Sequence, residues 1–97
     1  MHRILFRPQA RDKFDAAGDW YERESRGLGK AFLDAVETQL SRIGADPLAY
    51  PVVHRDIRKA ALRRFPYCIY FRLRGDAIVV LAVFHTARNP ATWKRRS

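Results

Sequence analysis

Residues 67–85 read YCIYFRLRGDAIVVLAVFH, two runs of β-forming residues separated by Gly75 and Asp76. From Tyr67 to Leu73, every second residue is large and apolar or aromatic, which is the two-residue period of a strand with two different faces. The second run is apolar on both faces, which is typical of a central strand. A Gly-Asp pair suits a tight turn, so the stretch predicts a β-hairpin in the middle of a sheet.

Two more strands are expected earlier in the chain. The run AALRRF at residues 60–65, just before Pro66, has the composition of a strand. Ile4 and Phe6 alternate within RILFR and indicate a short strand that ends at Pro8. Pro8 also suits the first turn of a helix, where the N–H that proline lacks has no partner in any case.

Two amphipathic helices are expected between these strands. Apolar residues recur at helical spacing in two series: Ala10, Phe14, Ala17 and Tyr21, then Leu28, Phe32, Val36, Leu40 and Ile43. The segment SRGLG between the two series predicts a short turn, Gly44 is expected to cap the second helix, and Pro47 to stop it. We therefore expect one α+β domain over residues 1–97, in the order β-α-α-β-β-β. An αα-hairpin would pack on one face of a small, mainly antiparallel sheet.

The net charge of +9 comes entirely from the second half of the chain. Residues 1–46 carry eight Lys and Arg against eight Asp and Glu, whereas residues 47–97 carry eleven against only Asp56 and Asp76. This asymmetry favours a surface for an acidic partner, such as nucleic acid, the ribosome or an acidic protein segment. The alternative is a basic surface that only keeps a small domain in solution.

Other classes of function find little support in the sequence. No stretch of about 20 apolar residues is present, and a single cysteine, Cys68, fits a reducing cytosol, so we expect a cytoplasmic location and no membrane. Cys68 is expected to be a small buried side chain rather than a nucleophile. His2, His54 and His85 lack metal-ligand spacing, and GLGK at residues 27–30 lacks the length and context of a phosphate loop. We expect neither a metal nor a cofactor.

His85 ends the last predicted strand, where it would share a face with Val79, Leu81 and Val83. An imidazole there is a candidate general acid or base for metal-independent RNA cleavage. Such a reaction also needs cations for the phosphate charge of the transition state. The candidate catalytic set is His85, Arg63, Arg64 and Arg88, with Arg58 as a further cation. The alternative is a histidine that only hydrogen-bonds to the following turn.

Arginines near aromatic residues can also bind without catalysis, either to phosphates and bases or to an acidic peptide. The candidate binding set comes from the strand region before Pro66, from the end of the last strand and from the basic residues after it: Arg58, Arg63, Arg64, His85, Arg88, Trp93, Lys94, Arg95 and Arg96.

Three parts of this pattern, in their order and spacing, resemble the ParE/RelE superfamily of type II toxin–antitoxin toxins. They are the second helix that ends in a P..YP segment, RFPY.IYF, and VLAVFH..R.P..W..R. The resemblance covers about three quarters of the chain. It implies the β-α-α-β-β-β fold, toxicity in the bacterial cytoplasm, and a cognate antitoxin that we expect to be acidic and of the ribbon-helix-helix type. Toxin and antitoxin would form a hetero-oligomer.

Two activities are associated with this superfamily. ParE-like members are taken to poison DNA gyrase, and RelE-like members cleave mRNA on the ribosome. RelE-like toxins carry a catalytic arginine in the middle hairpin strand, near the position of Tyr67 or Cys68 here, and an aromatic or histidine acid–base near His85. The missing arginine argues against RNA cleavage, with Arg63 or Arg64 as its possible substitutes. The FPY and H..R.P..W patterns favour a ParE-like toxin that acts by binding gyrase. A RelE-type endoribonuclease is the alternative, so whether the chain is an enzyme stays open, and a decayed toxin is a third reading.

Overall fold

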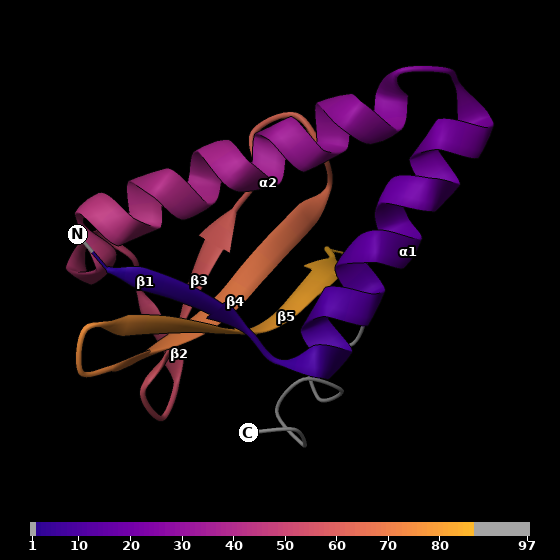
Figure 1. The fold of residues 1–97 in the computed structure, drawn as a ribbon. Coiled ribbons are helices and arrows are strands. Elements are labelled where there is room, and N and C mark those ends of the chain that lie inside the picture. Colours follow the sequence, from indigo (N-terminus) through magenta and orange to yellow (C-terminus); the bar gives the residue numbers. More distant parts are fainter. Residues whose placement is uncertain (1, 87–97) are drawn as a thin grey trace.

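The computed structural model describes residues 2–86 and shows two helices packed on one side of a twisted sheet (Figure 1). The elements are β1 (Arg3–Phe6), α1 (Pro8–Glu24), α2 (Leu28–Ala45), a short 3-10 helix (Pro47–Ala49), β2 (Val52–His54), β3 (Ile57–Ala61), β4 (Tyr67–Arg74) and β5 (Ala77–His85). The expected α+β class and αα-hairpin are confirmed, and the predicted elements follow one another along the chain in the expected order. The sheet has one more strand than expected, β2. The sequence did not predict β2, because a strand of three residues is too short to show a period.

The five strands lie in the order β1-β5-β4-β3-β2. The β4–β5 hairpin is the longest pairing, from Tyr67 opposite His85 to Arg74 opposite Ala77, and Gly75 takes the left-handed conformation at its turn. Strand β1 pairs with β5 in parallel, and the other pairs are antiparallel. Strand β5 is therefore central, flanked by β1 and β4, as its two apolar faces predict.

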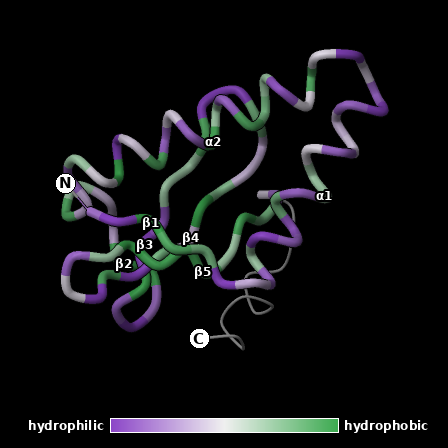
Figure 2. Tube along the Cα trace, in the orientation of Figure 1, coloured by the Kyte–Doolittle hydropathy of each residue, from purple (hydrophilic) through white to green (hydrophobic). Residues whose placement is uncertain are grey.

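The main core lies between the helices and one face of the sheet. The two apolar helix stripes are confirmed, because Phe14 of α1 and Phe32 and Val36 of α2 are buried against Phe71 and Val80 of the central strands. In Figure 2 the central strands are mostly in the hydrophobic colour, while the hydrophilic colour recurs along the helices. Burial of these faces is the largest stabilising contribution that the residues make to this fold.

The two helices approach each other closely at two glycines, Gly18 of α1 and Gly29 of α2. A Cβ placed on Gly29 would lie 2.7 Å from the carbonyl oxygen of Gly18, closer than real Cβ contacts. The Glu22 carboxylate accepts hydrogen bonds from the backbone N–H groups of Gly27 at 3.0 Å and Gly29 at 3.0 Å, so a carboxylate caps the start of α2. Gly27 takes the left-handed conformation with φ of 85°. The GLGK segment is thus a turn and the first residues of a helix.

Two expectations about local structure are wrong. The predicted strand at residues 60–65 is displaced: β3 covers Ile57–Ala61, and the chain then turns so that Leu62 and Phe65 both enter the core instead of alternating. The Leu62 N–H donates to the Tyr67 carbonyl at 2.9 Å and closes this turn. Gly44 is not a left-handed cap, because α2 continues through Ala45.

The assignment of His85 to a face of β5 also needs correction. The register with β4 shifts between Tyr70 and Phe71, which lie opposite Ala82 and Val80. The extra residue, Leu81, is a β-bulge, so the side-chain alternation changes phase there. His85 therefore shares the helix-covered face with Val83 and not with Val79 or Leu81, whose side chains belong to the second face.

Candidate partner-binding surfaces

The second face of the sheet, opposite the helices, carries a small apolar cluster. Its buried members are Ile57, Cys68, Tyr70, Leu81, Ala82 and Phe84. Burial raises the pKa of the Cys68 thiol, and the nearby Lys59 ammonium offsets this only in part. A thiol with a raised pKa stays protonated at neutral pH and is a poor nucleophile. Cys68 is a buried side chain, as expected.

Arg72 lies on this same face. Among the described residues, it is the one charged residue that is buried. Its Nη2 lies 3.1 Å from Oδ1 of Asp56, and Asp56 is shared with Arg74 at 3.5 Å. Within residues 2–86 its Nε is buried and has no hydrogen-bond partner. Sequence reasoning missed this pair, because nothing in the spacing of Asp56 and Arg72 signals that their side chains meet.

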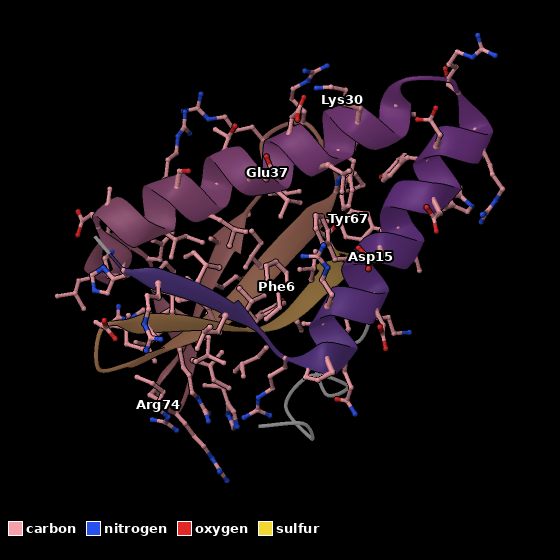
Figure 3. All side chains as sticks on the ribbon, in the orientation of Figure 1. Phe6, Asp15, Lys30, Glu37, Tyr67 and Arg74 are labelled. Atoms are coloured by element: carbon pink, nitrogen blue, oxygen red, sulfur yellow. The ribbon has the colours of Figure 1, made fainter. Side chains whose placement is uncertain are left out.

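His85 stands at the end of β5 and packs edge-on against the Tyr67 ring, with 5.3 Å between ring centres. The two residues line a hollow of about 660 Å³ between α1 and the ends of β4 and β5. Lys13 and Trp20 of α1 line its other side, and the Trp20 side chain is half exposed. Figure 3 places Tyr67 between the sheet and the helices. Sequence reasoning did not assign Lys13 or Trp20 to a site, although both lie on exposed positions of an amphipathic helix.

Arg63 and Arg64 lie in the turn between β3 and β4 and line a different hollow, of about 260 Å³, against α2. Arg42 of α2 lines the same hollow, and next to it the Gln39 side chain donates to the Ala61 carbonyl at 3.2 Å. Three guanidinium groups thus gather beside α2, of which the sequence predicted two. Clustered arginines of this kind suit an anionic partner.

Arg58 is held elsewhere. Its Nη1 donates to the Tyr50 carbonyl at 2.6 Å, and it lies opposite Phe71 on β4, whereas His85 lies opposite Tyr67. Four residues of strand separate the two positions, about 13 Å. The described members of the predicted set therefore occupy three places. Arg88, Trp93, Lys94, Arg95 and Arg96 lie outside the described residues.

Both carboxylates of the basic half of the chain are already engaged. Asp56 contacts Arg72 and Arg74, and Asp76 lies 3.3 Å from Arg3. Among residues 2–86, the ion pairs do not include Arg63 or Arg64. The excess positive charge is thus left to meet a partner or the solvent.

Within the described part of the chain, no group of three or more His, Cys, Asp and Glu side chains is arranged to hold a metal ion. None of the described helices has both the length and the apolar character needed to cross a bilayer.

Comparison with known protein families decides the family. Residues 4–90 match the model of the ParE toxin of the type II toxin–antitoxin system parDE. The chain belongs to the ParE toxin family. It is 37% identical to Toxin ParE2 of Mycobacterium tuberculosis over 76 residues, which are 78% of this chain and 66% of that toxin. The chain thus aligns with slightly under two thirds of the length of this curated ParE relative.

Two solved structures share the fold of this ParE family member. The chromosomal ParDE TA system from P. aeruginosa aligns with a TM-score of 0.64 at 22% identity, covering 88% of this chain and 96% of that one. The isolated E. coli RelE toxin aligns with a TM-score of 0.67 at 16% identity, covering 98% and 95%. The match to both confirms the ParE/RelE fold. At these identities the two likenesses concern the fold alone.

Proposed function

We propose that this ParE-family toxin is neutralised by a cognate antitoxin and acts in the cytoplasm by binding and poisoning DNA gyrase. The observation that carries the proposal is which residues β4 has at the position where RelE-like toxins carry a catalytic arginine. Here these residues are Tyr67 and Cys68. Tyr67 packs with the helix-side core, and Cys68 is buried in the second-face cluster. Neither side chain can supply a guanidinium to a phosphate, so binding is the activity that this strand supports.

The position of the cations supports the same reading. Acid–base cleavage of RNA requires a proton-transfer group and a cation within reach of one phosphate. Arg63 and Arg64 face α2, and Arg58 is bonded to the Tyr50 carbonyl, so these groups do not converge on His85. A binding surface has no such requirement, because separate charged patches can each contact a large partner.

RelE-type cleavage of mRNA on the ribosome is the second candidate. One observation favours it: Lys13 and His85 line the same hollow, so an ammonium and an imidazole are available together beside Tyr67. A substrate phosphate in that hollow would meet an ammonium group and an imidazole, which is a candidate proton-transfer group.

We expect the antitoxin to be acidic because the toxin has a net charge of +9. The ribbon-helix-helix module is what the resemblance to the toxin superfamily implies. Opposite net charges accelerate association and favour the correct partner. The arginines beside α2 are the part of the described surface best placed to contact such a partner.

Induced expression in a bacterial host separates the candidates. We expect arrested growth, loss of plasmid supercoiling and intact messages, and we expect rescue by the protein encoded in the adjacent open reading frame. Purified toxin should also inhibit supercoiling by gyrase in vitro. Codon-phased cuts in translated messages would instead support the endoribonuclease, and unaffected growth would support a decayed toxin.

The matched variants are His85→Ala and Lys13→Ala. Both should keep most of the gyrase inhibition, since a peripheral contact contributes about 1–2 kcal/mol to binding. Both should abolish message cleavage if the hollow at His85 is a nuclease site. Arg63→Ala with Arg64→Ala tests the patch beside α2 in the same assays.

A further inference from the structure

The two layers of the molecule differ in charge. Residues 8–46, which form the two helices and their connection, carry six Lys and Arg against eight Asp and Glu. Residues 2–7 and 47–86, which form the strands, the 3-10 helix and the turns, carry nine Lys and Arg against only Asp56 and Asp76. The positive charge of the described residues is therefore concentrated in the sheet layer, while the helix layer is slightly acidic.

Four cations of the sheet layer belong to the second face, and we call them the second-face cations: Arg3, Lys59, Arg72 and Arg74. Side chains alternate between the faces of a strand, and the sequence neighbours of these cations pack with the helix-side core: Ile4, Ala60, Phe71 and Leu73. Figure 3 shows Arg74 on the side of the sheet away from the helices. None of the four belongs to the sets that the sequence predicted.

The strand register spreads these cations over four neighbouring strands. Arg3 of β1 and Arg74 of β4 both lie opposite Ala77 of β5, so two strand spacings, about 10 Å, separate their backbones. Arg72 lies two residues, about 7 Å, from Arg74 along β4. Lys59 extends the set to β3. One carboxylate or phosphate is too small to contact all four, so this arrangement suits a polyanion with repeated charges.

Arg72 has a hydrogen-bond donor that the described residues leave unused. Its Nη2 lies 3.1 Å from Oδ1 of Asp56, whose other oxygen lies 3.5 Å from Arg74. Within residues 2–86 the Nε of Arg72 is buried and has no partner, which is costly for a polar group. An anionic oxygen brought to this face by a ligand would satisfy this N–H, and the fork of a guanidinium matches the geometry of a phosphate.

The aromatic side chains of this face are unsuited to binding unpaired bases. Tyr70 and Phe84 belong to its apolar cluster and are only 8% and 4% exposed. Proteins that bind single strands stack the bases on accessible aromatic rings, whereas contacts to a duplex backbone need only cations and are independent of sequence. Interfaces with DNA are also much more positively charged than interfaces between proteins. The second face therefore favours a duplex over a single strand or an acidic protein.

From this arrangement we propose that the second face binds the phosphate backbone of duplex DNA. Arg3, Lys59 and Arg74 contact phosphates, and the Nε of Arg72 donates to a phosphate oxygen. The helix layer, which is slightly acidic, faces away from the duplex. The inference goes beyond gyrase binding, because it gives the toxin a contact with DNA of its own.

Fluorescence anisotropy of a labelled duplex, titrated with the full-length toxin, measures this binding without gyrase. A duplex of about 20 base pairs should bind, and the logarithm of its association constant should fall linearly with the logarithm of the salt concentration. The double variant Lys59→Gln with Arg74→Gln should weaken binding by about tenfold or more at about 50 mM salt. It should also reduce the salt slope by about 2, because each substitution removes about one phosphate contact.

The matched control is Arg23→Gln with Lys30→Gln on the helix layer. It removes the same charge and, like the first pair, changes one lysine and one arginine at exposed positions, one of them in an ion pair. This control should bind DNA within about twofold of the unaltered toxin, with the same salt slope. Equal weakening by the two folded double variants would show that net charge alone attracts DNA, and would overturn the inference.

Three further results bear on the same proposal. Tighter binding to the single strand of the same sequence, or to polyglutamate, would overturn the assignment of the face to a duplex. Absence of duplex binding by the unaltered toxin would overturn it as well. A toxin that binds DNA through this face but leaves supercoiling by gyrase unaffected would support this inference and contradict the proposed function, so the two can fail separately.

Discussion

The two faces of strand β4 bury side chains of different kinds. On the helix side, Tyr67 joins a cluster of aromatic rings. The centre of the Phe32 ring lies 5.3 Å from that of Phe65 and 5.1 Å from that of Tyr67. On the second face, Cys68 and Tyr70 are followed by Arg72, a buried cation held by the half-exposed Asp56. The helix side is thus a closely packed layer of large apolar side chains, whereas the second face combines a thin apolar layer with a buried charge.

The difference shows how stability and function can be divided between two sides of one strand. The helix side is close-packed from two layers, so it can supply most of the folding free energy. A buried arginine contributes little net stability compared with an apolar residue of similar size. The second face therefore carries a desolvation cost that the helix side lacks. Four predictions measure how large this contrast is.

The largest effect is expected at the centre of the helix side. Phe32 is fully buried among aromatic rings, so Phe32→Ala should lower the free energy of unfolding by about 3–5 kcal/mol. Leu81→Ala on the second face should cost less, about 2–3 kcal/mol, because fewer layers surround it. Urea unfolding followed by circular dichroism gives both values. Equal costs would remove the contrast between the faces, and Leu48→Ala, at an exposed position, is the control.

The next effect tests the packing of the helix layer itself. Gly29→Ala would place a Cβ 2.7 Å from the Gly18 carbonyl oxygen, so we expect a loss of about 1–3 kcal/mol as the helices move apart. Gly44→Ala is its matched control, because Gly44 is helical and has nothing within 4 Å of such a Cβ. That substitution should stabilise the chain by up to about 1 kcal/mol. Thermal unfolding of the two variants should therefore shift in opposite directions.

A smaller effect is expected from the charge on the second face. Asp56→Asn leaves the Arg72 guanidinium without its carboxylate, but Asp56 is half exposed, so the loss should be about 1–2 kcal/mol rather than that of a fully buried pair. Asp76→Asn removes the exposed pair with Arg3 and should cost at most about 0.5 kcal/mol. Arg72→Met should be close to neutral. A large loss in Arg72→Met would mean that the cation stabilises this face after all.

The smallest effect concerns the Cys68 thiol on the second face. Its pKa in the folded chain lies above the ordinary value of 9.0 because of burial, so the unfolded chain releases this proton first as the pH rises. The contribution to stability is complete below the ordinary pKa and is lost as the pH rises through the folded pKa. Urea midpoints measured from neutral to alkaline pH should fall, and Cys68→Ala should flatten this fall. An identical pH profile in the two proteins would contradict the assignment.

The parts of the fold that were predictable have strong local periods. The helix stripes around Phe14 and Phe32, and the alternation from Tyr67 to Leu73, depend on residues near each other in sequence, and all were confirmed. The displaced strand before Pro66 and the bulge at Leu81 were not predictable, because in both places packing against distant residues overrides the local pattern.

The candidate sites were less predictable for the same reason. The number of cations in the basic half indicated a partner, but which of them gather depends on tertiary contacts. Arg42 of the neutral half joins Arg63 and Arg64 beside α2, while Arg72 is withdrawn by Asp56. A groove lined by Phe6 of β1 and Glu37 of α2 could not be predicted from the sequence. It depends on the position of β1 at one end of the sheet and on residues far apart in the chain.

The parallel pairing of β1 with β5 has a consequence for synthesis of the toxin in the cell. Arg3 lies opposite Ala77, so the sheet closes only after nearly the whole chain has left the ribosome. Contacts between such distant segments form late and slow the folding of a small domain. A nascent or truncated chain that ends before β5 therefore leaves β1 without the strand that it pairs with among the described residues, and its sheet stays unfinished.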